Sequence, residues 1–175
     1  MFSDRILSPY SERRRRNPRA GFSLIEMLIV LAIIGVILTF AIPKLTSALR
    51  GAKETAAVKA ITTLQTAQVQ YYSSFGRFAA SLQELGPPAS GGPGPSAAEL
   101  IDRELSTGEK GGYRFTLAAS PAGYVINATP TADSNGSKTF LSDQSMGIHV
   151  HNGKEPATLS DPLFGETVPQ QQEAK

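Results

Sequence analysis

The chain of 175 residues contains no cysteine. This absence excludes disulfides and thiolate metal sites, so cysteine usage does not indicate the cellular compartment. The sequence also lacks a phosphate-binding glycine loop, a nucleophile paired with a base, and a recognisable set of metal ligands. Its length allows one domain of ordinary size. We therefore expect a protein that is not an enzyme and that binds no cofactor or metal.

Basic residues are in slight deficit outside the first 21 positions. Six arginines precede Phe22 against Asp4 and Glu12, which gives +4, whereas the remaining 11 basic and 13 acidic residues give −2. The net charge of +2 thus depends on the N-terminal leader and does not indicate a nucleic-acid surface. We expect no nucleic acid partner for the monomer.

A long apolar run follows this basic leader, from residue 22 to residue 42, and its one charged residue is Glu26. As a helix, 21 residues cover about 30 Å, the thickness of the hydrocarbon core of a bilayer. The positive-inside rule keeps the arginine-rich flank in the cytoplasm, so the chain after Pro43 lies outside it. The pattern predicts a single membrane span.

Three other interpretations of the run remain. A secretory signal has a shorter apolar region without an acid and a small-residue cleavage site, which "LTFAIP" does not resemble. A twin-arginine signal is suggested by "RRRR", but the following residues do not continue that pattern. A plain anchor explains everything except Glu26 and the abrupt "AGF" junction.

The basic leader, Gly21, Phe22, the sequence "SLIE" and the aliphatic run together resemble the prepilin N-terminus of type IV pilins and type II secretion pseudopilins. The resemblance covers about residues 13–50. It implies that a prepilin peptidase cuts between Gly21 and Phe22 and that Phe22 is then N-methylated. It also implies an inner-membrane subunit, an assembly platform with a motor ATPase, and a periplasmic or extracellular filament made of copies of the chain.

The implied function is that of a structural subunit of a type IV pilus or a pilus-like filament. Two alternatives lie in the same class: a type II secretion pseudopilin that moves exported proteins, and a minor pilin for DNA uptake. A membrane-anchored enzyme or binding module is the alternative from another class.

Glu26 is unfavourable in the span, since a carboxylate in hydrocarbon costs about 2–3 kcal/mol. The resemblance implies that it pairs with the N-terminal ammonium of Phe22 in a neighbouring subunit, which would fix the axial offset between subunits. The alternative is that Glu26 extends to the lipid headgroups.

A helical period continues beyond the span, so a single helix is predicted over residues 22–75, with Gly76 as its stop. Only Gln68 interrupts the stripe formed by Ala57, Ile61, Leu64, Gln68, Tyr71 and Phe75. Pro43 removes a backbone donor, and Gly35 makes the nearby backbone easier to open. The resemblance implies that the helix from Gly35 to Pro43 is flexible and unwinds in the filament.

The rest of the chain predicts a small head, and the fold class is α+β: a long N-terminal helix packed against an antiparallel β-meander. Residues 1–21 are the leader, 76–112 a Pro/Gly-rich connection with a short helix over 97–105, and 152–175 a loosely held polar tail. The meander occupies 113–151, with strands in "YRFTL", "GYVINA", "TFLS" and "GIHVH".

A few residues of the head invite other interpretations. His149 and His151 share a strand face and are expected to face solvent rather than a metal, because no third ligand is apparent. The sequence "DSNG" from Asp133 to Gly136 is expected to form a simple turn, with calcium binding as the alternative. Aromatic side chains near the helix end are expected in the core between helix and head: Tyr71, Tyr72, Phe75 and Phe78.

Overall fold

The computed structural model describes residues 21–166, so the predicted leader (1–21), apart from Gly21, and the last nine residues of the chain lie outside the described part. The chain divides into two compact units, one ending at Ala41 and the other beginning at Ile42. One helix, α1 (Leu24–Phe75), contributes to both units. It begins two residues after the predicted start and ends at the predicted residue.

In the first unit, α1 is exposed along its whole length from Leu24 to Ala41. The side chains there are almost all aliphatic, and none of them packs against another element of this unit. An apolar surface of this extent is not expected on a helix that stays in water.

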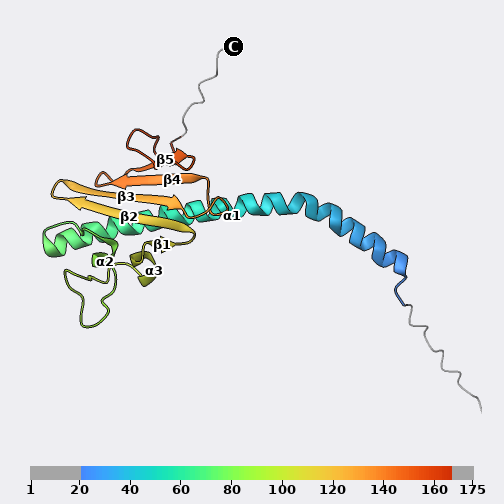
Figure 1. Cartoon of the computed structure of the whole chain (residues 1–175), viewed down its shortest axis with the longest axis horizontal. Coiled ribbons are helices and arrows are strands. Elements are labelled where there is room, and N and C mark those ends of the chain that lie inside the picture. Colours follow the sequence, from blue (N-terminus) through green and yellow to red (C-terminus); the bar gives the residue numbers. More distant parts are fainter. Residues whose placement is uncertain (1–20, 167–175) are drawn as a thin grey trace, which may run out of the picture. The chain divides into compact units, whose positions relative to one another are not determined.

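The second unit combines the rest of α1 with two short helices, α2 (Leu82–Leu85) and α3 (Arg103–Ser106), and one sheet (Figure 1). Its five strands are β1 (Glu109–Lys110), β2 (Tyr113–Ser120), β3 (Gly123–Pro130), β4 (Lys138–Asp143) and β5 (Ile148–Asn152). The strands follow one another in the sheet in chain order, and every neighbouring pair is antiparallel. The predicted α+β fold with a meander is confirmed, and β1 is an addition.

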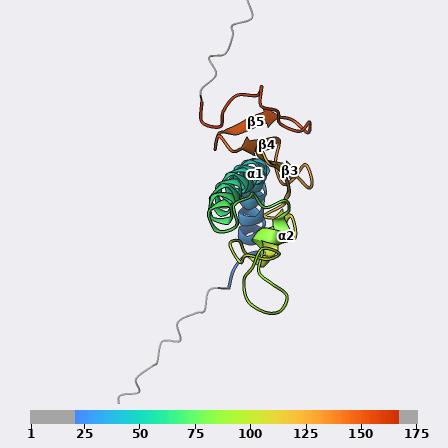
Figure 2. The same cartoon turned by 90° about the vertical axis from the view of Figure 1, so that its left-hand side faces the viewer.

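The sheet packs on the C-terminal half of α1 (Figure 2). The helix contributes Ala57, Ile61, Leu64 and Tyr71, which are buried at the predicted spacing of three and four residues. The strands contribute alternate residues, such as Tyr113 and Phe115 in β2, as the period of two requires. These side chains meet in one core cluster.

The helix ends at Gly76, as predicted. Gly76 has φ +72°, a left-handed conformation that favours glycine, and its N–H donates to the Tyr72 carbonyl at 2.8 Å. Most of the predicted aromatic contacts form around this end, since Tyr71 is fully buried and the rings of Tyr72 and Phe78 lie 4.8 Å apart. The prediction that Tyr72 lies in the core is wrong, because this side chain on the outer face of the helix is 49% exposed.

The predicted helix over residues 97–105 is wrong for its first part. Asp102 caps α3 by accepting a hydrogen bond from the Leu105 N–H at 2.9 Å, so the helix starts only at Arg103. Before it, the N–H groups of Ala98 and Leu100 donate to the Glu84 and Leu85 carbonyls, both at 2.8 Å. The chain there is irregular, with Glu99 at φ +57°, and its backbone is hydrogen-bonded to α2.

The prediction of a loosely held tail from Asn152 onward is also wrong up to residue 166. The Val150 N–H donates to the Pro162 carbonyl at 2.9 Å, and the Phe164 N–H donates to the Ile148 carbonyl at 2.6 Å. The segment 162–164 thus pairs with β5. Phe164 also packs edge-on against Phe140, with 5.9 Å between the ring centroids.

Candidate functional site

The candidate assembly segment is the apolar part of α1. Its most apolar window of 18 residues has a mean hydropathy of 2.8, and none of that window is buried. Within residues 21–166 this is the one helix long and apolar enough to cross a membrane. Within the described part of the chain, the side chains that most need to leave water therefore have no cover.

Gly21 and Phe22, the predicted cleavage pair, precede the first helical residue. Phe22 is 75% exposed, and a Cβ placed on Gly21 would meet nothing within 4 Å. The peptide bond between them thus lies outside regular structure, between two exposed residues. Whether it is cut stays a prediction.

Glu26 lies in the first turn of α1 and is exposed among aliphatic side chains. Among the described residues, no hydrogen bond or ion pair reaches its carboxylate. The N-terminal end of a helix attracts negative charge weakly, but that attraction does not replace a cation. Glu26 therefore still needs a partner from outside these residues once it enters hydrocarbon.

The Gly35 to Pro43 segment is helical in the single chain, and Pro43 lies inside α1. Pro43 has no N–H to donate to the Thr39 carbonyl. The Thr39 hydroxyl in turn donates to the Gly35 carbonyl at 3.0 Å, which competes with the helix bond at that carbonyl. The prediction that this segment unwinds in a filament remains a prediction, with one absent helix bond and one shared carbonyl in its favour.

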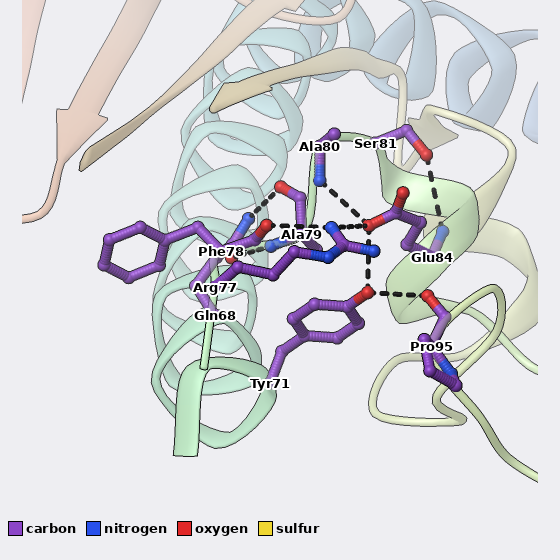
Figure 3. Close-up of polar contacts among 9 residues, drawn as sticks. All are labelled: Gln68, Tyr71, Arg77, Phe78, Ala79, Ala80, Ser81, Glu84 and Pro95. Carbon is purple, nitrogen blue, oxygen red and sulfur yellow. Dashed lines mark hydrogen bonds and ion pairs between the residues drawn. The ribbon is translucent and has the colours of Figure 1, made fainter. Parts of the chain in front are cut away.

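Gln68 has a structural role that was not evident from the amino-acid sequence. The residue is fully buried, and its side-chain amide bonds to the backbone of Ala79 in both directions (Figure 3). Gln68 interrupts the apolar stripe because its side chain hydrogen-bonds α1 to the chain that follows the helix. A buried amide needs such partners, because an unpaired one would be strongly destabilising.

Tyr71, Arg77 and Glu84 form a second contact at the end of α1 (Figure 3). The Tyr71 hydroxyl is 3.0 Å from Glu84 Oε2 and 2.6 Å from the Pro95 carbonyl, and Arg77 Nη1 is 2.8 Å from Glu84 Oε2. Burial raises the pKa of Glu84, but hydrogen bonds from Arg77 and the Ala80 N–H outweigh it and hold the pKa below its ordinary value. Burial, reinforced by Glu84, raises the pKa of Tyr71. The cluster fastens the long connection to the helix.

Glu54 fastens the opposite end of the head to α1. Its carboxylate accepts hydrogen bonds from the N–H and hydroxyl of Ser137, at 3.0 and 3.1 Å, and pairs with Lys138 at 3.4 Å. Burial alone would raise the pKa of Glu54, but these contacts lower it. The burial of Glu54 on the core face of α1 was not predicted. A usable signal was that Glu54 lies three residues before Ala57, the first residue of the apolar stripe.

The "DSNG" segment forms a turn whose oxygen atoms are engaged by lysines. Lys53 Nζ donates to Asn135 Oδ1 at 2.7 Å, and Lys154 Nζ lies 2.9 Å from Asp133 Oδ1. A cation would have to displace both ammonium groups, which disfavours calcium at this turn.

His149 and His151 do not face open solvent, contrary to the prediction. Both are half-buried, and their Nδ1 atoms contact Asp161 of the tail: His149 at its carbonyl (2.6 Å) and His151 at its carboxylate (2.9 Å). Hydrogen bonds from His151 and from Thr158 lower the pKa of Asp161 to about 2. Within residues 21–166 no group of three acidic or histidine side chains is placed to hold a metal.

A long N-terminal helix with an exposed apolar part, together with a small antiparallel sheet, matches a pilin-like α+β fold. The comparisons with known proteins agree with this class. Residues 16–42 match the family model described as "Prokaryotic N-terminal methylation motif". The type IV major pilin protein PilA of Myxococcus xanthus (strain DK1622) is 38% identical over 73 residues.

That match covers 41% of this chain and only about one third of the relative, 33% of its length. No solved structure matches the chain. The motif, the relative and the fold together support the type IV pilin and pseudopilin family.

Proposed function

We propose that the chain is a structural subunit of a type IV pilus or a pilus-like filament. A prepilin peptidase removes residues 1–21 and methylates Phe22, and an inner-membrane platform with its motor ATPase then draws the subunit from the bilayer into the filament. The observation that carries this proposal is an apolar helix without any buried residue in its most apolar window. In the filament, the helices of neighbouring copies provide the cover that lipid provides before assembly.

Glu26 gives the packed helices their register. Cleavage after Gly21 creates a cationic N-terminus on Phe22, which remains charged after methylation. Pairing this cation with Glu26 of another copy compensates an unfavourable charge in the apolar surroundings. The two groups can meet at only one axial offset between the two helices. The partner of Glu26 is thus the new N-terminus of its neighbour.

The experiment that tests this function is the Glu26→Ala variant expressed in a strain that lacks the native gene. Insertion into the membrane should be unchanged or easier, because the substitution removes about 2–3 kcal/mol of insertion cost. Sheared surface filaments should disappear. The matched control is Glu104→Ala, an exposed acid of the head, which should form normal filaments.

A type II secretion pseudopilin is the second candidate, favoured by the absence of a cysteine pair that could staple the C-terminal loop. Overexpression helps to separate the candidates of this class, because a major subunit gives abundant long fibres and a minor subunit, such as a minor pilin for DNA uptake, does not. A membrane-anchored enzyme or binding module would instead keep its function in a fragment of residues 44–175, without any need for Glu26.

A further inference from the structure

Two cations follow the apolar run and lack partners among residues 21–166. Lys44 is exposed, Arg50 is half-buried, and neither side chain makes a hydrogen bond or ion pair there. The Arg50 Nε is shielded from solvent and is also without a partner in that range.

The other cations at this end of the head are engaged. Lys53 bonds to Asn135, Lys138 pairs with Glu54, and Lys154 pairs with Asp133. Unlike these three lysines, Lys44 and Arg50 form no ion pair or side-chain hydrogen bond with the described part of the head.

Helix geometry places both cations near the end of the predicted span. At 1.5 Å per residue, Lys44 lies about 3 Å and Arg50 about 12 Å beyond Ile42 along the axis. The headgroup layer on each side of a bilayer is about 5–8 Å thick. Side chains of a helix slope toward its N-terminus, and this slope turns the long Arg50 side chain back toward the layer.

The apolar surface also continues past Pro43, which is typical of a helix at a membrane interface. Leu45 is 60% exposed and Leu49 is 53% exposed, and both lie between the two cations in the sequence. Leucines beside cations let apolar groups reach the acyl chains while the lysine and arginine heads meet phosphates.

We infer that Lys44 and Arg50 form a binding site for the phosphates of anionic phospholipids, in the leaflet on the non-cytoplasmic side. The inference rests on the proposed membrane span. An anionic lipid leaves its phosphate charge uncompensated, whereas a zwitterionic lipid carries its own amine, so the site prefers the anionic one. Once the arginine-rich leader is removed, these two residues hold the waiting subunit to its lipids and must release them when it enters a filament.

The sequence contains no tryptophan, so a single introduced tryptophan gives a clean local reporter. The Ile42→Trp chain is reconstituted into vesicles of phosphatidylcholine and phosphatidylglycerol, with either lipid brominated in its acyl chains. The ratio of quenching by the two brominated lipids measures which one gathers at this end of the span. We expect a preference for phosphatidylglycerol of about five-fold per cation at low salt, reduced as the salt concentration rises.

In the Lys44→Gln/Arg50→Gln background the preference should fall close to one. Lys59→Gln is the matched control: Lys59 is exposed on the same helix but lies about 25 Å beyond Ile42, too far to reach a headgroup, and the preference should persist. A second reporter, Leu24→Trp, should keep its phosphatidylglycerol preference in the double variant, because the leader arginines act at that end.

Equal quenching by both lipids around Ile42→Trp in the unsubstituted background would overturn the inference and leave the span intact. A loss with Lys59→Gln as large as that with the double variant would also overturn it, because the effect would then be one of overall charge. Absence of quenching by either lipid would overturn both the span and the inference.

Discussion

Gln68 and Ala79 form a reciprocal pair of hydrogen bonds inside the head. Gln68 Nε2 donates to the Ala79 carbonyl at 3.0 Å, and the Ala79 N–H donates to Gln68 Oε1 at 2.9 Å. The pair joins α1 to the segment that leads into α2, so it fixes where the chain turns back along the helix.

Replacing Gln68 with leucine should destabilise the head by about 2–4 kcal/mol, because it leaves both backbone groups of Ala79 buried and unpaired. The measurement is the urea midpoint of the full chain in detergent micelles. Gln70→Leu is the control, since Gln70 is exposed on the same helix and its replacement should change the free energy of unfolding by less than about 0.5 kcal/mol. Equal midpoints for both variants would contradict the role of Gln68.

Asp161 should hold the tail on β5. Asp161→Asn removes the charge that His151 Nδ1 contacts, so amide exchange should become faster at Val150 and Phe164, whose N–H groups bond across this junction. Hydrogen exchange measured residue by residue tests this. Asp133→Asn, a change in an exposed ion pair, should leave both amides as they are.

The stability that the contact between Asp161 and His151 provides should depend on pH. The pKa of Asp161 is held at about 2, below its ordinary value of 3.8, so its stabilising contribution is complete above about pH 4 and is lost as the pH falls toward 2. The protection factor of the Val150 amide, its exchange rate corrected for the intrinsic pH dependence, should therefore fall over that interval in the parent chain more than in Asp161→Asn. A parallel response of the two chains would show that Asp161 is not the group responsible.

Pro43→Ala should stiffen the predicted flexible segment. The substitution supplies the N–H that the Thr39 carbonyl lacks and removes a helix cost of about 3 kcal/mol. In assembled filaments the amides from 35 to 43 should then exchange more slowly, and the filaments should stretch less under force. Gly51→Ala, a change at an uncrowded helix glycine outside the segment, is the control for helix propensity alone. Slow exchange in this segment of the parent filament would mean that it does not unwind.

The parts of the fold that the sequence predicted well depend on periodicity over many residues. The apolar run and the stripe through Ile61 and Leu64 extend over enough turns that the long helix has no competitor. The strands were found for the same reason, since alternation in "YRFTL" puts Tyr113 and Phe115 on one face.

The parts that were missed depend on single contacts. The short α2 had a usable signal, because Ser81 and Glu84 have the spacing of a capping box and the Glu84 N–H donates to Ser81 Oγ at 3.4 Å. The error at 97–105 came from treating Asp102 as an interior helix residue when it is a cap.

The docking of the tail could not be predicted, because the pairing of residues 162–164 with β5 is a long-range choice without a local pattern. This pairing, with Asp161 against His149 and His151, closes the C-terminal loop without a disulfide. For the assembly segment, the identities of Gly21, Phe22 and Glu26 came from the motif. Their proposed roles involve a peptidase and a second copy of the chain, so the fold of one chain does not test them.

Processing and assembly are tested most directly by intact-mass and fragment analysis of subunits recovered from filaments sheared from the cell surface. We expect chains that begin at Phe22 and carry one added methyl group on its amine. Filaments built from chains that still begin at Met1 would contradict this expectation, because no cationic terminus would then exist beside the Glu26 of a neighbouring copy.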